Sequence, residues 1–199
     1  WKASARLSRL ASNEYEAERV TDVVIVAECQ GVERLGRAGR EVADAVMRIV
    51  ASLALRLLSD GNRVGVVVGG RRGAWVRPGF GKRQLRRILH ALAVAEPGGH
   101  VATEQLLVYI LPYVCKPESQ ILLVTPLLGP AARRAASDLT SRGYSVAVLA
   151  VNPFSPPPGG EAGVAARVLE LERAARLIRL SRLCRVVDLP LGLLGGAAL

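Results

Sequence analysis

The sequence predicts an α/β fold, a doubly wound and mostly parallel sheet with helices on both faces. Short apolar runs rich in β-branched residues, such as DVVIVA and RVGVVV, lack polar alternation, which is typical of strands buried on both faces. Longer segments between them repeat apolar residues at steps of three and four, which predicts helices. Strands that alternate with helices of this length pair in parallel through right-handed crossovers. A chain of 199 residues can bury the core of one such domain.

The first half of the chain contains two predicted buried strands and a hairpin. DVVIVA is followed by a glycine-containing loop, GVERLGRAGR, and then by a helix over residues 41–58, after which Gly61 is a C-terminal cap. RVGVVVGG is the second buried strand, and RRGAWVRPG is predicted to return beside it as a third strand. Helices are predicted next over residues 82–95 and 103–114.

The second half continues the alternation of strands and helices. QILLVTP and YSVAVLAV are predicted strands, separated by the helix GPAARRAASDLTSRG, which Gly143 closes. NPFSPPPGGEAG is rich in proline and glycine, so it connects two elements and does not extend the sheet. A last helix over residues 164–180 precedes the predicted final strand CRVVDLPL.

The formal charge of +10 raises the question of nucleic-acid binding. The basic residues are nearly all arginine and are scattered, aromatic residues that could stack on bases are few, and no reading module is recognisable. This distribution argues against nucleic acid and favours a solvated surface, or one that faces an acidic partner or anionic lipid. The densest basic groups are Arg71, Arg72, Lys82, Arg83, Arg86 and Arg87.

Cysteine usage and the start of the chain bear on the compartment. The three cysteines are isolated, which supports neither a disulfide framework nor a zinc site and fits a reducing cytoplasm. No apolar run is long enough to span a bilayer, and no signal-peptide pattern is present. Because the first residue is Trp1 and not methionine, we expect a piece of a longer protein whose upstream part could carry an anchor.

The loops beyond the carboxyl ends of the strands are the places to look for a site, because such sheets bind ligands at the switch in strand order. Two ends stand out, after the first predicted strand and after QILLV. Their residues are Ala27, Glu28, Cys29, Gln30, Gly31, Thr125 and Pro126. The glycine-rich stretch GVVVGGRRG lacks the spacing of a phosphate loop and a helix directly after it, so we interpret it as a hairpin turn.

The opening WKASARLSRLASNEYEAER resembles the sequence box of the domain-of-unknown-function fifty-eight family, in which it leads into a von Willebrand factor A-like domain. The order of VVIVA, GNRVGVVVGG, VRPGFGKRQLRRILHAL, QILLVTPL and RGYSVAVLAV agrees with that family over nearly the whole chain. The resemblance divides the chain into the box and lead-in, residues 1–20, and the α/β domain, residues 21–199. We expect a structural role for the box residues Trp1, Lys2, Ala5, Arg6 and Glu18.

Members of this family are often membrane-anchored and encoded beside MoxR-type AAA+ ATPases. The resemblance therefore implies an adaptor or assembly partner: the cytoplasmic domain of a membrane-anchored protein, bound to such an ATPase or to a membrane complex.

Von Willebrand A domains usually hold a divalent cation through Asp-x-Ser-x-Ser, a later threonine and an aspartate after the fourth strand. A hard ion such as Mg²⁺ prefers these oxygen ligands. Here the aspartate position falls on Ala27 or Glu28, and neither register supplies two hydroxyls. The later aspartate is replaced within Thr125-Pro126-Leu127. Of the usual ligands only Thr103 could remain, and a threonine that opens a helix is more often its N-cap. We expect a degenerate metal site, no cofactor and no enzymatic activity, so that the domain acts through protein–protein contact.

Two other functions stay open at this point. A hydrolase-like enzyme would use Cys29 as the nucleophile with Glu28 at the strand ends, although a small buried thiol is the interpretation we favour for Cys29. A basic nucleic-acid-binding domain would show affinity that falls steeply with salt.

Overall fold

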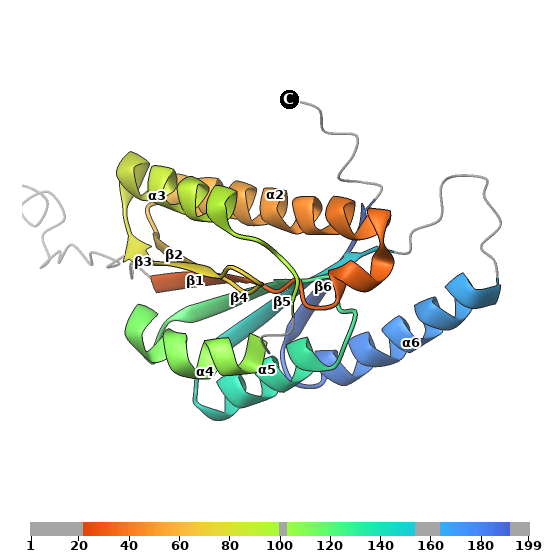
Figure 1. Ribbon diagram of the computed structural model, residues 1–199. Helices are drawn as coiled ribbons and strands as arrows, with labels where there is room; N and C mark the ends of the chain where they lie inside the picture. Colours follow the sequence, from red (N-terminus) through yellow and green to blue (C-terminus); the bar gives the residue numbers. More distant parts are fainter. Residues whose placement is uncertain (1–21, 100–102, 154–163, 192–199) are drawn as a thin grey trace, which may run out of the picture.

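The computed structural model describes residues 22–99, 103–153 and 164–191. In these residues the chain forms a six-stranded sheet with the order β3-β2-β1-β4-β5-β6 (Figure 1). Neighbouring strands pair in parallel, except that β3 runs antiparallel to β2. The strands are β1 (Asp22–Ala27), β2 (Arg63–Val68), β3 (Ala74–Gly79), β4 (Gln120–Thr125), β5 (Ser145–Asn152) and β6 (Arg185–Pro190). The doubly wound, mostly parallel sheet with helices on both faces and the hairpin are confirmed.

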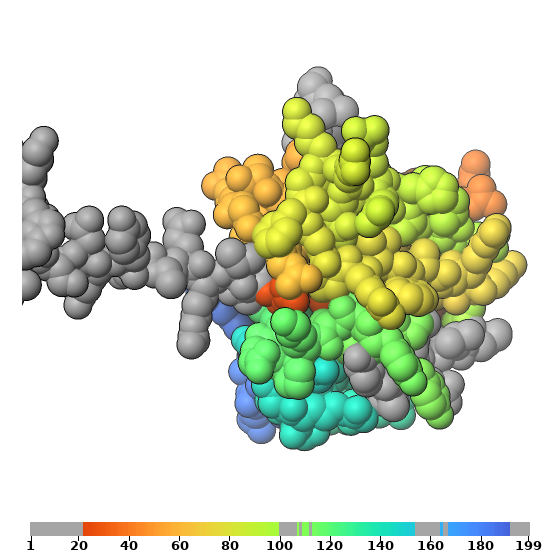
Figure 2. All heavy atoms as spheres, turned by 90° about the vertical axis from the view of Figure 1, so that its left-hand side faces the viewer, coloured from red at the N-terminus to blue at the C-terminus, as the bar shows by residue number. Residues whose placement is uncertain are grey.

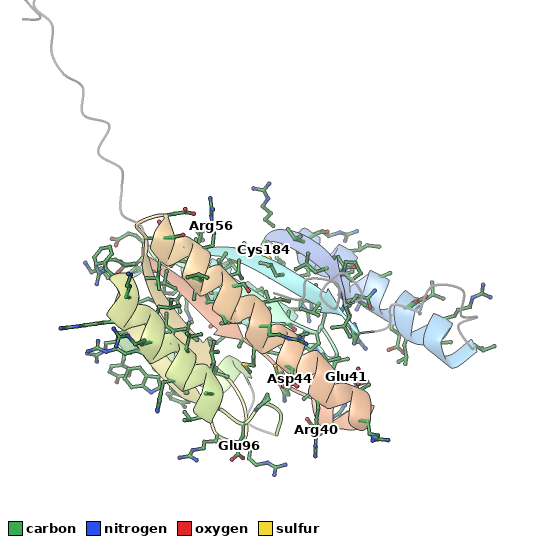
Figure 3. The ribbon with its side chains drawn as sticks, turned by 90° about the horizontal axis from the view of Figure 1, so that it is seen from above. Arg40, Glu41, Asp44, Arg56, Glu96 and Cys184 are labelled. Atoms are coloured by element: carbon green, nitrogen blue, oxygen red, sulfur yellow. The ribbon has the colours of Figure 1, made fainter. Side chains whose placement is uncertain are left out.

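Helices cover both faces of this sheet. α2 and α3 lie on one face, and α4, α5 and α6 lie on the other (Figure 1). The helical elements are the 3₁₀ helix η1 (Val32–Leu35), α2 (Arg37–Ser59), α3 (Gly81–Val94), α4 (Thr103–Val114), α5 (Ala131–Ser141) and α6 (Val164–Ser181). Seen from above, the charged side chains of Arg40, Glu41 and Asp44 point outward along α2 (Figure 3).

The core is divided by the sheet into two apolar clusters. Val24 and Val26 of β1 face α4 and α5, whereas Ile25 and Ala27 face α2 and α3, as period-two alternation requires. These four side chains are fully buried. A strand with helices on both sides has no polar face, so the unbroken run VVIVA reflects its central position.

The segment 31–40 differs from the sequence prediction. It was expected to be a loop, but it contains η1 and the first turn of α2, which begins at Arg37. Gly31 and Gly36 adopt φ of 86° and 58°, which few residues other than glycine tolerate. Gly39 lies within α2, where an added Cβ would overlap the carbonyl oxygen of Val32. The glycines here permit close packing and do not mark an irregular loop.

The described helices include none that is both long enough and apolar enough to cross a bilayer.

Candidate functional site

The candidate site is a crevice at the carboxyl ends of β1 and β4. β1 is adjacent to β2 on one side and to β4 on the other, so the strand order reverses between β1 and β4. The chain leaves β1 at Glu28 and leaves β4 at Pro126, and the amide of Glu28 donates to the carbonyl of Val124 at 2.9 Å. This is the place where an open α/β sheet presents ligand-binding loops, and the sheet brings together the two ends that the sequence predicted.

Glu28 has a carboxylate that is held inside the fold. The residue is 3% exposed, and both of its side-chain oxygens accept hydrogen bonds. The hydroxyl of Thr125 donates to Oε2 at 2.5 Å, and the amide of Gln30 donates to Oε1 at 2.7 Å. Burial raises the pKa of the Glu28 carboxyl, and the bonds from Thr125 and Gln30 offset only part of that effect.

The loop after β4 has a conformation that is fixed by a hydrogen bond. Leu127 adopts φ of 55° although it is not glycine, and its amide donates to Oγ1 of Thr125 at 2.9 Å. The single hydroxyl of Thr125 therefore donates to Glu28 and accepts from Leu127. Where an aspartate was expected to hold a cation, a threonine links the two strand ends.

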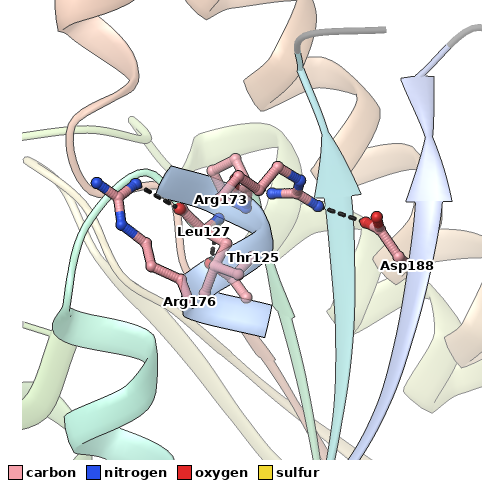
Figure 4. Close-up of polar contacts among 6 residues, drawn as sticks. Thr125, Leu127, Arg173, Arg176 and Asp188 are labelled. Carbon is pink, nitrogen blue, oxygen red and sulfur yellow. Dashed lines mark hydrogen bonds and ion pairs between the residues drawn. The ribbon is translucent and has the colours of Figure 1, made fainter. Parts of the chain in front are cut away.

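Two arginines of α6 hold this loop from the other side (Figure 4). Arg173 is 2% exposed, donates from Nη1 to the carbonyl of Pro126 at 2.8 Å and pairs with Asp188 of β6 through Nη2 at 2.5 Å. Arg176 donates from Nη1 to the carbonyls of Leu127 and Leu128 at 3.2 and 3.0 Å. Neither arginine stands out in the sequence, because the pattern of α6 is that of an ordinary amphipathic helix with charges on its solvent side.

The thiol of Cys29 lies against the sheet and does not open into the crevice. Cys29 is 1% exposed and packs in the cluster under α2. Burial, with a smaller contribution from the neighbouring carboxylate of Glu28, raises the pKa of this thiol well above its ordinary value. A nucleophilic cysteine needs the opposite shift.

A pocket of about 400 Å³ opens beside these groups. Glu28, Gln30 and Gly31 line it from the β1 side, and η1, the start of α5 and the side of α6 complete its wall. Among the described residues that line the pocket, three are arginines: Arg34, Arg134 and Arg176.

The other predicted site residues do not gather here. Ala27 is a buried core residue of β1, and Pro126 contributes its carbonyl to Arg173. Thr103 is the first helical residue of α4, one position after the place of an N-cap. The box residues Trp1, Lys2, Ala5, Arg6 and Glu18 lie outside the described residues. In the part of the chain that the structure describes, no group of three His, Cys, Asp or Glu side chains is placed to hold a metal ion.

The basic residues lie on the surface, away from the crevice. Arg71 and Arg72 are exposed at the β2–β3 turn, where the backbone of Arg72 pairs with that of Glu96. Lys82, Arg83, Arg86 and Arg87 are exposed along α3. In the same GKRQL segment, Gln84 is buried and donates from Nε2 to the carbonyls of Val64 and Arg77, each at 2.7 Å. The segment therefore fastens α3 to the hairpin.

Comparison with known proteins identifies related chains. The family described as "Protein of unknown function DUF58" matches residues 1–160. The structure of proximal thread matrix protein 1 from the mussel byssus is similar, with a TM-score of 0.52 and 14% identity over 88% of this chain and 44% of that chain. At such identity the likeness shows the fold alone.

Two bacterial structures are also similar. One is an aerotolerance-related membrane protein from Bacteroides fragilis NCTC 9343, with a TM-score of 0.46 and 14% identity over 85% of this chain and 90% of that chain. The other is the conserved hypothetical protein BatB from Bacteroides thetaiotaomicron, with a TM-score of 0.48 and 15% identity over 88% of this chain and 94% of that chain. No curated protein sequence matches this chain.

Proposed function

This chain belongs to the family described as protein of unknown function DUF58, and we propose that it acts by binding a partner protein, without cation or covalent chemistry at its crevice. The observation that carries the proposal is the state of Glu28. Its carboxylate is buried, and both oxygens already accept hydrogen bonds from Thr125 and Gln30. A cation ligand must offer a lone pair to the ion, so recruiting Glu28 would require breaking these contacts.

The burial of Cys29 supports the same proposal against the hydrolase-like alternative. A thiol that is 1% exposed and has a raised pKa is a poor nucleophile. The described residues that line the crevice include no histidine, so none of them supplies an imidazole base for this thiol.

An exposed aromatic face supports partner binding. Tyr109 and Tyr113 lie one turn apart on α4 and are 71% and 72% exposed, and Trp75 of β3 is 48% exposed. Trp75 lies opposite Val67 in the antiparallel register, and Val67 packs in the cluster under α4, so Trp75 is on the α4 side of the sheet. β3 and α4 are adjacent on the face shown in Figure 2. Exposed Trp and Tyr are the residue types that most often anchor interfaces.

By the family resemblance, the partner we propose is a MoxR-type AAA+ ATPase, or a complex that such an ATPase serves at a membrane. Binding of the purified ATPase to this chain, measured by surface plasmon resonance, tests the proposal. The double change Tyr109→Ser with Tyr113→Ser is expected to weaken binding about thirtyfold or more, because the loss of even one aromatic side chain at an interface core costs on the order of 2 kcal/mol.

The matched control removes the crevice carboxylate and keeps its shape. Glu28→Gln is expected to bind the ATPase as the unchanged chain does, and calorimetric titration of either chain with Mg²⁺ is expected to give no saturable heat. Saturable Mg²⁺ binding that Glu28→Gln abolishes, together with loss of the ATPase in that variant, would contradict the proposal.

A further inference from the structure

Most of the net positive charge of the chain belongs to one segment of the fold. Residues 61–95, which form β2, β3 and α3, contain none of the 17 carboxylate side chains. They contain eight of the 27 lysine and arginine side chains, so this segment accounts for eight of the ten net positive charges. The eight residues are Arg63, Arg71, Arg72, Arg77, Lys82, Arg83, Arg86 and Arg87. The surface of this segment is therefore where an anionic partner would be attracted most strongly.

Four of these cations lie on α3 and form a surface that we call the basic face. Its members are Lys82, Arg83, Arg86 and Arg87. All four are exposed, and none of them pairs with a carboxylate of the described residues. Seen from above, side chains that end in nitrogen project outward from α3 (Figure 3). Among the described residues, nothing neutralises the basic face.

This arrangement of charge disfavours the helix that carries it. Lys82 and Arg83 lie in the first turn of α3, which has no acidic residue, and the positive end of the helix dipole repels cations there. Lys82 is also one turn from Arg86, and Arg83 is one turn from Arg87, a spacing at which like charges destabilise a helix. An anionic surface in contact with α3 would offset both effects.

Apolar side chains lie beside the cations. Phe80, directly before α3, is 55% exposed, and Leu89, three residues after Arg86, is 44% exposed. The guanidinium of Arg63 lies over the Phe80 ring, 5.6 Å from its centroid. Cations next to exposed Phe and Leu on a helix are typical of surfaces that lie in the headgroup region of a bilayer. A nucleic-acid interface is polar and has no use for Leu89.

We propose that the basic face of α3 binds an anionic lipid bilayer. The four cations contact the headgroups, while Phe80 and Leu89 enter the boundary between headgroups and acyl chains. At the contribution usual for a cation near an anionic membrane, four of them give an association constant on the order of 10³ M⁻¹ toward accessible lipid. Binding of this strength orients the domain on a membrane and remains reversible.

The basic face is separate from the surface proposed for the partner protein. α3 lies on one face of the sheet with α2, whereas α4, which carries Tyr109 and Tyr113, lies on the other face (Figure 1). A membrane in contact with α3 therefore leaves the two tyrosines of α4 accessible. The inference goes beyond the proposed function and does not depend on it.

Cosedimentation of the full chain with lipid vesicles tests the inference. One set of vesicles is pure phosphatidylcholine, and the other contains equal parts of phosphatidylcholine and phosphatidylglycerol, both at millimolar lipid. Saturable binding to the anionic vesicles is expected, and it should weaken as NaCl is added, because salt screens the attraction. No binding to pure phosphatidylcholine is expected. Absence of binding to the anionic vesicles, or equal binding to both sets, would overturn the inference.

The double change Arg86→Gln with Arg87→Gln is expected to weaken binding to the anionic vesicles about thirtyfold, because each cation contributes about fivefold. The matched control is Arg179→Gln with Arg182→Gln, an equal loss of charge at exposed positions at the end of α6. The control is expected to leave binding unchanged. Equal weakening by the two double changes would show that net charge, and not the basic face, attracts the vesicles.

Phe80→Ser separates a bilayer from a soluble polyanion. Phe80 occupies the N-cap position of α3 and provides no side-chain hydrogen bond, and serine is favoured there, so the variant keeps the helix. It is expected to weaken vesicle binding about fivefold, because the exposed part of the ring no longer leaves water.

Duplex DNA, measured in the same buffer by fluorescence anisotropy, is the comparison ligand. DNA bound more tightly than the anionic vesicles, with no effect of Phe80→Ser on vesicle binding, would overturn the inference in favour of nucleic acid. No ATPase enters these measurements, so their failure and the failure of the proposed function are separate results.

Discussion

Burial separates Glu28 from an ordinary surface glutamate. In the sequence it is the carboxylate at a strand end, which is a typical position for a catalytic acid or a metal ligand. In the fold its neighbours are the hydroxyl of Thr125 and the amide of Gln30, and it is 3% exposed. A group whose folded-state pKa lies above its unfolded value binds its proton more tightly in the folded state.

This leads to a prediction about stability and pH. Because burial raises the pKa of Glu28 above 4.5, the group supports folding fully below that pH and loses its contribution as the pH rises through the folded-state pKa. Glu28→Gln should remove this pH-dependent loss of stability, because the glutamine side chain does not titrate. The variant's free energy of unfolding, relative to that of the unchanged chain, should therefore rise with pH by at most about 1.4 kcal/mol per pH unit. Urea unfolding of both chains across this pH range measures the difference in their free energies of unfolding.

The control for this prediction is an exposed glutamate. Glu41→Gln on the outer side of α2 is expected to change stability by no more than about 0.5 kcal/mol at any of these pH values. A pH profile for Glu28→Gln that parallels that of the unchanged chain would show that Glu28 titrates as a surface group.

At the scale of elements, the junction between α3 and the hairpin depends on one amide side chain. Gln84 donates two hydrogen bonds, to a carbonyl of β2 and a carbonyl of β3, and so joins three elements. Gly79 permits this approach, because an added Cβ there would lie 2.8 Å from Oε1 of Gln84. The basic residues on either side of Gln84 point to solvent and take no part.

Gln84→Ala is therefore expected to lower the free energy of unfolding by about 1–3 kcal/mol, since it leaves two carbonyls without their donor. Arg83→Ala, the neighbouring change on the exposed side of α3, is expected to stay within about 0.5 kcal/mol. Urea denaturation of both variants measures the difference. Equal effects would mean that α3 is held by its apolar contacts alone.

The elements could be predicted from the sequence because each depends on local pattern. The runs VVIVA and ILLV identify buried strands by their lack of polar residues, and the two strand ends follow from the topology. The bonds that shape the crevice could not be predicted this way. Thr125 and Glu28 are 97 residues apart, and Arg173 reaches Pro126 from a distance of 47 residues. Nothing in the spacing of these residues distinguishes them from solvated ones, because only tertiary packing buries them.

At the scale of the whole molecule, burial decreases from the middle of the sheet toward one edge. In β1, every residue from Val23 to Ala27 is buried, whereas every residue of β6 is exposed or only partly buried. Local unfolding begins where few apolar contacts hold the backbone. Figure 1 shows β6 at the edge of the sheet, with β5 as its neighbour.

We therefore expect native-state hydrogen exchange to be slowest in β1 and β4 and faster in β6. β1 and β6 each have six residues, so strand length does not bias the comparison. Exchange followed by mass spectrometry on peptides that cover each strand measures the gradient. Equal protection of β6 and β1 would indicate that the sheet opens as one cooperative unit.

The attachment of α6 to the loop after β4 could couple the crevice to the outer surface of that helix. Through Arg173 and Arg176, this helix holds the backbone that forms one side of the pocket, while Leu171 and Ile178 of the same helix are 71% and 58% exposed. A protein that binds those exposed side chains and tilts α6 would also move the pocket wall, because the two arginine side chains connect the helix directly to that wall. In turn, a ligand in the pocket would restrict the motion of α6. Binding of the protein to α6 and binding of the ligand in the pocket would then share one coupling free energy.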